Sequence, residues 1–188
     1  MWRMWRFVIP IGLFAALIGF FFFSLDRDKE TLPSPLLGKP APAFELPRLE
    51  DPSRQVAGRD FAGNPYVLNV WATWCVGCRQ EHETLLEIAR RGEVPIVGLN
   101  WKDDSAQAQR WLHELGNPYV TVASDSEGRT AIDWGVYGAP ETFLIDASGT
   151  VIYKHIAPMT IEIWEREFLP LIRQGYMEIG RASCRERV

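Results

Sequence analysis

The sequence predicts an α/β fold in which a mixed central sheet is covered by helices on both faces. Apolar, β-prone segments alternate with segments of helical periodicity, and the last two strand-like segments are joined by a short turn and followed by a helix. The chain has 188 residues, 47% hydrophobic and 23% charged, a length that fits one domain with accessory segments. This composition predicts a globular domain with its own core.

The first predicted element is an apolar helix that anchors the chain in a membrane. Residues 7–25 carry no charged side chain, and a membrane-spanning helix needs about 17–25 such residues. Arg3 and Arg6 precede this run, so the positive-inside rule predicts a cytoplasmic N-terminus with the remainder of the chain across the membrane. A cleaved signal peptide is the alternative, but the run ends in bulky phenylalanines instead of the small residues of a cleavage site. We therefore predict that residues 1–25 are an uncleaved signal anchor.

A proline-rich linker is predicted to follow the anchor. Five prolines fall within residues 30–47, and this spacing prevents a long helix and favours an extended chain. We assign residues 26–37 to the linker and residues 38–177 to the folded domain. Turn-forming residues continue as far as Pro65.

A strand, a turn with two cysteines and a helix are predicted next. Residues 66–71 are apolar and β-prone, as in a buried strand. Residues 81–91 show helical periodicity, and Gly92 is predicted to end that helix. Cys75 and Cys78 therefore lie between the strand and the helix, in or just before the first helical turn.

This position has a chemical consequence for the two cysteines. Unpaired backbone N–H groups and the positive end of a helix dipole favour a thiolate over a thiol, and Cys75 lies nearer the helix end. Cys75 is therefore the predicted nucleophile, with a lowered pKa. Cys78, one turn later, can attack a mixed disulfide formed at Cys75. The two residues are the predicted catalytic pair and redox-active disulfide.

Three other uses of the cysteine pair are less favoured. A zinc site would need a second ligand pair, and the three histidines (His82, His113 and His155) are scattered along the sequence. Covalent haem attachment would need a histidine where Arg79 stands. A purely structural disulfide would close a very short loop, and such a pair more often cycles between redox states. No metal is therefore predicted.

The remaining segments continue the alternation of strands and helices. One helix is predicted to begin at Asp104 or Ser105 and to end at Gly116, and another to begin at Thr160 and to be kinked or ended by Pro170. Strands are predicted at residues 95–99, 119–123, 142–145 and 150–156. The last two strands are joined by a four-residue hairpin connection at residues 146–149.

Several segments together resemble a known family. They are residues 69–78, 79–82, 98–104, 115–119 and 135–146, the last of which reads Gly-Val-Tyr-Gly-Ala-Pro-Glu-Thr-Phe-Leu-Ile-Asp. The chain resembles membrane-anchored thioredoxin-like proteins, and more narrowly the DsbE/CcmG family of thiol:disulfide interchange proteins in cytochrome c maturation. The resemblance covers roughly residues 38–175 and implies a thioredoxin-like fold.

The resemblance also implies residues that support the cysteine pair. Pro140 is expected to follow a cis peptide bond and to pack against the cysteines. Trp74 is expected either to shield the disulfide or to serve only in packing. His82 is expected to be a surface or structural residue, and residues 102–104 a solvated loop.

Two acidic residues are candidates for proton transfer at the cysteines. Asn69 stands where thioredoxins, which this chain resembles, carry a buried aspartate, and an asparagine cannot titrate. Glu81 and Glu141 are the acids to which the resemblance points instead, because a nearby carboxylate can accept the proton of Cys78. The alternative for both is a solvated surface acid.

The resemblance implies reduction of disulfides in apocytochrome c, or in a thiol protein of the haem-ligation machinery, on the periplasmic side of a bacterial inner membrane. Electrons are expected from a membrane donor of the DsbD or CcdA type, and no cofactor is expected. The alternatives are a general periplasmic disulfide oxidase or isomerase, and a non-redox module that binds apocytochrome. The direction of electron flow depends on the reduction potential of the pair.

Composition limits the remaining possibilities. The net charge of −4 argues against general affinity for nucleic acid. The third cysteine, Cys184, lies in residues 178–188, which depart from the family's usual end and resemble a translated sequencing adapter. We predict that this tail is not native, with a genuine basic tail as the alternative.

Overall fold

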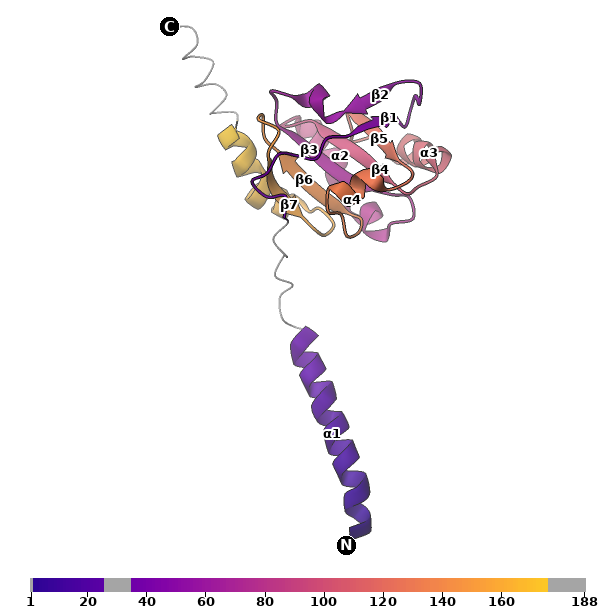
Figure 1. Ribbon diagram of the computed structural model, residues 1–188, viewed down its shortest axis with the longest axis vertical. Helices are drawn as coiled ribbons and strands as arrows, with labels where there is room; N and C mark the ends of the chain where they lie inside the picture. The colour runs from indigo at the N-terminus through magenta and orange to yellow at the C-terminus, as the bar shows by residue number, and fades with distance from the viewer. Residues whose placement is uncertain (1, 26–34, 176–188) are drawn as a thin grey trace. The chain divides into compact units, whose positions relative to one another are not determined.

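The computed structural model describes residues 2–25 and 35–175, and the chain divides after residue 32 into two units, each considered by itself (Figure 1). In the first unit, Trp2–Leu25 form helix α1, so the predicted apolar segment is helical. No helix among the described residues combines the length and the apolarity needed to cross a membrane. Most of the predicted linker and the whole predicted tail, with Cys184, lie outside the described residues.

A five-stranded mixed sheet forms the centre of the second unit. Its strands are β3 (Tyr66–Trp71), β4 (Ile96–Trp101), β5 (Thr121–Asp125), β6 (Glu141–Ile145) and β7 (Val151–His155). They lie in the order β5-β4-β3-β6-β7, with β3, β4 and β5 parallel and β6 antiparallel to both of its neighbours. All of β3 is buried, as its continuous apolar character predicts.

Helices cover both faces of this sheet (Figure 1). They are α2 (Val76–Arg91), α3 (Ser105–Leu115), α4 (Arg129–Asp133) and α5 (Ile161–Ile163), which continues into the π-helix η2 (Trp164–Phe168). Alternate β3 side chains point to opposite faces. Val67 and Trp71 pack in a cluster with α2, α3 and η2, whereas Leu68 and Val70 pack in a second cluster with Trp134, which follows α4. The predicted thioredoxin-like α/β architecture is therefore present.

The segment before β3 is more ordered than its turn-rich sequence suggests. A small antiparallel pair, β1 (Glu45–Pro47) and β2 (Gln55–Ala57), is followed by a 3-10 helix, η1 (Gly58–Phe61). Phe44 and Val56 are buried in the second core cluster. Strands of three residues are too short to reveal a period in the sequence, and α4 escapes prediction for the same reason.

Most predicted boundaries lie within a few residues of the observed ones. Helix α2 begins at Val76, five residues before the periodic segment, and Gly92 ends it in the left-handed conformation. Pro170 does not end the last helix, because residues 169–175 remain helical. A proline has no N–H to donate to the carbonyl four residues earlier, and here that carbonyl belongs to Arg166, within the wider π turn of η2.

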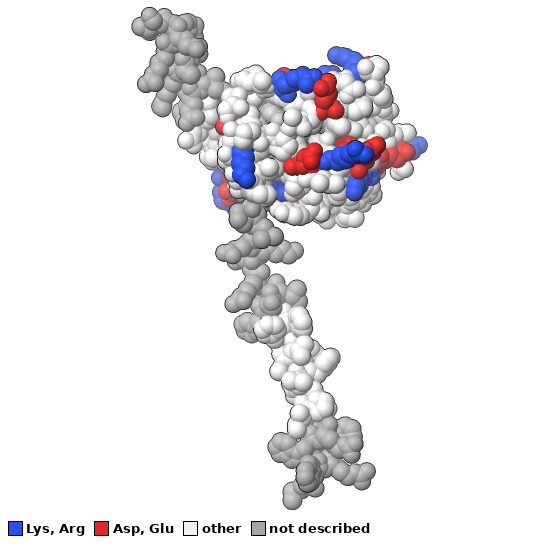
Figure 2. Space-filling view, viewed as in Figure 1, with Lys and Arg blue, Asp and Glu red and all other residues white. Residues whose placement is uncertain are grey.

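The charged side chains of the folded unit show no gathering of one sign on the face drawn in Figure 2. Basic and acidic residues lie interspersed there, with uncharged surface between them.

Candidate active site

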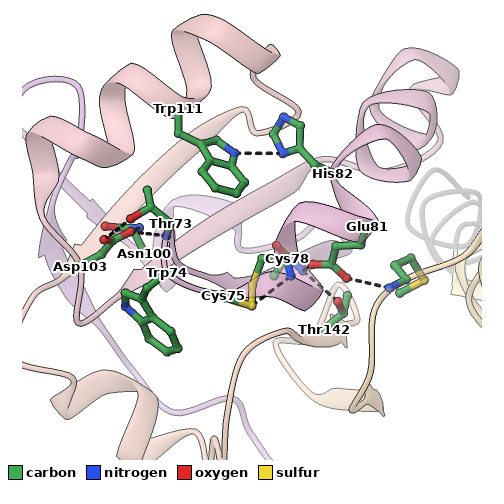
Figure 3. The surroundings of a disulfide bond; sticks show 12 residues. Thr73, Trp74, Cys75, Cys78, Glu81, His82, Asn100, Asp103, Trp111 and Thr142 are labelled. Atoms are coloured by element: carbon green, nitrogen blue, oxygen red, sulfur yellow. Dashed lines mark hydrogen bonds between the residues drawn. A yellow bond between two sulfur atoms is a disulfide. The ribbon is translucent and has the colours of Figure 1, made fainter.

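Cys75 and Cys78 form a disulfide at the start of α2, where the sequence predicts them to lie (Figure 3). Cys75 is the N-cap of the helix, and its Sγ accepts a hydrogen bond of 3.0 Å from the backbone N–H of Cys78. The Cα atoms are 5.3 Å apart, and both side chains are almost fully buried. A sulfur at this position faces the free N–H groups of the helix, which stabilise negative charge. The geometry favours a thiolate at Cys75 after reduction.

The loop that leads into Cys75 is held by Asp103. The Asp103 carboxylate accepts hydrogen bonds of 2.6 Å from both the backbone N–H and the hydroxyl of Thr73, and a third from the Asn100 side chain. Trp74 is 54% exposed, yet its indole N–H donates to the Lys102 carbonyl at 3.0 Å. Lys102 and Asp104 are exposed, as predicted for a solvated loop, whereas Asp103 is half-buried and holds the residues that precede Cys75.

The cis peptide bond expected at Pro140 is present, between Ala139 and Pro140. The proline ring packs against Gly77, the residue directly before Cys78. A Cβ added at Gly77 would lie 2.8 Å from Pro140 Cδ and 3.2 Å from Pro158 Cγ. Such a separation from Pro140 is shorter than any normal contact between carbon atoms. Glycine at position 77 thus permits the close approach of Pro140 to the cysteine pair.

Glu81 is fully buried beneath the cysteine pair and is not a solvated surface acid (Figure 3). Its Oε1 accepts a hydrogen bond of 2.9 Å from Asn69 Nδ2, and its Oε2 accepts one of 2.7 Å from the backbone N–H of Met159. Burial raises the pKa of Glu81 to about 7, because desolvation outweighs the two hydrogen bonds that favour the carboxylate. Glu81 lies three residues after Cys78, on the same face of α2. The Glu81 carboxyl therefore lies on the side of α2 that carries Cys78.

Asn69 connects Glu81 to two further buried side chains. Its Nδ2 also donates to Thr142 Oγ1 at 3.0 Å, and its Oδ1 accepts from the Tyr119 hydroxyl at 2.8 Å. Desolvation, with a smaller effect of the Glu81 charge, raises the pKa of Tyr119 well above its ordinary value, so the phenol remains a proton donor. All polar atoms of the Asn69 side chain are thus bonded.

Glu141 is also fully buried, but its contacts lead away from the cysteines. Its Oε1 accepts hydrogen bonds of 2.8 Å from the Tyr137 backbone N–H and 3.3 Å from that of Gly138. Its Oε2 lies 2.9 Å from Lys154 Nζ, with the geometry of an ion pair and not of a hydrogen bond. Lys154 in turn donates to the Gly135 carbonyl at 2.8 Å. Glu141 therefore holds the loop that carries Pro140, and is not a solvated surface acid either.

His82 is structural. One ring nitrogen contacts the Gly116 carbonyl at 3.0 Å, and the other accepts from Trp111 Nε1 at 3.4 Å. Burial lowers the pKa of His82, which favours the neutral ring. Within residues 2–25 and 35–175, no group of three or more His, Cys, Asp and Glu side chains could hold a metal ion.

Sequence reasoning missed four residues that shape this site: Tyr119, Thr142, Asp103 and Lys154. The first three lie in segments that carry the family resemblance, which was the available signal. Lys154 sits in a strand with no motif, so nothing in the sequence pointed to its pairing with Glu141.

The chain is similar to known redox proteins along most of its length. The Redoxin family matches residues 36–168. Proteins named thiol:disulfide interchange protein DsbE from Pseudomonas aeruginosa and Allochromatium vinosum are 45% and 43% identical over 167 residues, which cover 89% of this chain and 92% of each relative. The protein of that name from Escherichia coli K12 is 42% identical over 170 residues, 87% of this chain and 91% of the relative.

Solved structures share the fold. A secreted thiol-disulfide isomerase from Corynebacterium glutamicum superposes with a TM-score of 0.64 at 24% identity, over 71% of this chain and 85% of that chain. A thiol:disulfide interchange protein of the thioredoxin family from Chlorobium tepidum gives 0.59 at 24% identity, over 72% of this chain and 94% of that chain. At these identities the likeness supports the thioredoxin-like fold alone.

Proposed function

Because the chain belongs to the DsbE family of thiol:disulfide interchange proteins, and is therefore a thiol-disulfide oxidoreductase, we propose that it reduces disulfides of apocytochrome c, or of a haem-ligation thiol protein, during c-type cytochrome biogenesis. The observation that carries the proposal is the position of Cys75 as N-cap of α2, with its Sγ accepting a backbone N–H. That position stabilises the thiolate needed for attack on a disulfide.

The proposed reaction has two thiol exchanges. The reduced Cys75 thiolate attacks one sulfur of the client disulfide, forms a mixed disulfide and releases the other client sulfur as a thiolate. Cys78 then transfers its proton to the Glu81 carboxylate and attacks Cys75 Sγ, which releases the second client sulfur. The client gains two electrons and becomes a dithiol once its thiolates take up protons, while the Cys75–Cys78 pair is oxidised to its disulfide. A dithiol donor must return two electrons before the next cycle.

The neighbouring residues support these steps in different ways. Trp74 is held beside Cys75 and is about half exposed, so it can contact a client polypeptide. Pro140 packs against the residue between the cysteines and contributes no N–H of its own, so neighbouring backbone groups stay free to pair with a client strand. Glu141, paired with Lys154, acts by holding the loop of Pro140 in place.

We further propose that the chain is a single-pass protein of a bacterial inner membrane. Residues 7–25 would be the signal anchor, residues 26–37 the linker, and residues 38–177 the catalytic domain on the periplasmic side. The uncharged run and the preceding arginines support this arrangement. Anchoring would raise the local concentration of the domain near a membrane electron donor of the DsbD or CcdA type. Residues 178–188 would be a non-native tail.

Trapping the mixed disulfide tests the function. Full-length Cys78→Ser should accumulate a disulfide between Cys75 and the client, which non-reducing electrophoresis and mass spectrometry would identify. The matched control, Cys75→Ser, should trap nothing, because the nucleophile is gone. A Cys75→Ser protein that still supported cytochrome c assembly would point to a non-redox binding module instead.

The direction of electron flow needs a second measurement. A reductase should be found mainly as the dithiol when the thiols of growing cells are alkylated. A pair found mainly as the disulfide, with a potential as oxidising as that of a disulfide donor, would favour a general oxidase or isomerase.

A further inference from the structure

We propose that Tyr119 is a positioning residue for the resolving step: through the Asn69 amide, it keeps an N–H donor directed at the Glu81 carboxylate. This inference rests on the proposed function, in which Glu81 accepts the proton of Cys78. The three side chains come from positions far apart in the sequence, and all are buried. Tyr119 touches neither cysteine through any described hydrogen bond, so it acts through Asn69.

The contacts of Asn69 define one orientation of its amide. A carboxylate can only accept hydrogen bonds, so the group 2.9 Å from Glu81 Oε1 must be the amide nitrogen. The amide oxygen then faces Tyr119, whose hydroxyl donates to it at 2.8 Å. Among the described residues, the Tyr119 hydroxyl makes no other hydrogen bond. Turning the amide over would therefore leave a buried phenol O–H without an acceptor, which is costly.

The opposite orientation of the amide fits a protonated Glu81. In that arrangement the Asn69 oxygen accepts from the carboxylic acid O–H, and the amide nitrogen points towards Tyr119. Removal of the Tyr119 hydroxyl takes away the donor that the present orientation uses, so the alternative becomes easier to reach. Tyr119 therefore favours the ionised form of Glu81, the form that takes a proton from Cys78. No proton passes through Asn69 or leaves Tyr119.

Few other groups face Glu81 and could take over the role of Tyr119 and Asn69. The carboxyl is faced by Asn69 from β3, by the Met159 backbone N–H from the segment before α5, and by Cys78 from its own helix. Tyr119 is the titratable side chain behind Asn69. Within the described residues, no charged side chain makes a hydrogen bond or ion pair with Glu81. Among the described residues, the Asn69 amide is thus the side-chain hydrogen-bond donor to Glu81.

The test measures Glu81 directly in the oxidised full-length protein, by carboxyl-carbon NMR on glutamate-labelled samples titrated with acid and base. Tyr119→Phe should raise the Glu81 pKa by roughly 0.5 to 1 unit, the effect of losing one buried hydrogen bond that favours the carboxylate. Asn69→Leu, which removes the amide that donates to Glu81 Oε1, should shift it in the same direction. Tyr66→Phe is the matched control: Tyr66 is equally buried, but its hydroxyl has no hydrogen bond to the described residues.

Oxidised protein cannot turn over, so this result is independent of whether the proposed function is correct. An unchanged or lowered Glu81 pKa in Tyr119→Phe, or in Asn69→Leu if the first variant does not fold, would overturn the inference. In the reduced protein, the rate at which the mixed disulfide is resolved should lose its Glu81-dependent pH inflection in Glu81→Gln. If that inflection persisted in Glu81→Gln while the Tyr119→Phe shift was seen, the proton-acceptor role of Glu81 would be wrong and the positioning of Glu81 would stand.

Discussion

Glu81→Gln is expected to remove a pH-dependent loss of stability from the oxidised protein. Glu81 is fully buried, and burial raises its pKa from the ordinary value of 4.5 to about 7. The folded protein therefore binds this proton more tightly than the unfolded chain does. The contribution of Glu81 to stability is fully present below pH 4.5 and is lost as the pH rises through about 7.

The size of the effect follows from the difference between the two pKa values. A difference of about 2.5 units corresponds to about 3 kcal/mol, at 1.36 kcal/mol for each unit. About 2.5 kcal/mol of this falls between pH 5 and pH 8, because part of the unfolded population has already ionised at pH 5. The free energy of unfolding of the wild-type protein should include this loss, and that of Glu81→Gln should not.

Reversible urea unfolding of the oxidised full-length proteins at pH 5 and pH 8 measures the difference. Any pH-independent effect of the new amide cancels in the comparison between the two pH values. His82 and His155, whose pKa values burial lowers, contribute equally to both proteins. Glu114→Gln, an exposed change on α3, should retain the wild-type pH dependence. The reasoning fails if wild type and Glu81→Gln lose the same free energy between pH 5 and pH 8.

Substitutions at three further positions probe the surroundings of the cysteine pair. Lys154→Met leaves the buried Glu141 carboxylate without its ion partner, so the free energy of unfolding should fall by about 3 kcal/mol in urea titrations; a loss below about 1 kcal/mol would contradict a stabilising pair. Gly77→Ala should destabilise the protein by about 1 to 3 kcal/mol and slow client reduction, because its Cβ would collide with Pro140; a gain in stability, as for most exposed helix glycines, would be the opposite result. Asp103→Ala should cost about 1 to 3 kcal/mol and slow alkylation of reduced Cys75, whereas Asp103→Asn, which keeps one acceptor oxygen, should lose less of both.

The local structure around the cysteine pair could be predicted from the sequence. The 27 consecutive residues 66–92 contain an apolar strand, two cysteines three residues apart and a periodic segment that ends in glycine. Helix ends and buried strands depend on residues that are neighbours in sequence, so their patterns can be recognised without knowledge of the tertiary structure. The short strands β1 and β2 were not accessible, because three residues carry no period and their pairing depends on the core beneath them.

The burial and the contacts of the two candidate acids, Glu81 and Glu141, could not be predicted from the sequence. Spacing puts Glu81 on the face of α2 that carries Cys78. Whether that face is exposed to solvent depends on β3 and on Met159, which is 78 residues further along the chain. Glu141 follows Pro140 in the sequence, yet its side chain turns to Lys154 on the neighbouring strand. Glu81 lies on the cysteine side of α2 and Glu141 holds a loop, although the sequence predicts the same role for both.

By itself, the sequence determined the fold class, the place of the cysteine pair at the start of α2, and the family, because each of these depends on order and spacing along the chain. Tertiary structure alone decided which buried polar groups meet: Asn69 with Tyr119, which lie 50 residues apart, and Glu81 with the Met159 amide. A buried carboxyl or amide must find its partners within hydrogen-bond distance or bear a large desolvation cost. Those partners are chosen by how distant segments pack around β3, and that packing sets whether Glu81 can take up a proton near neutral pH.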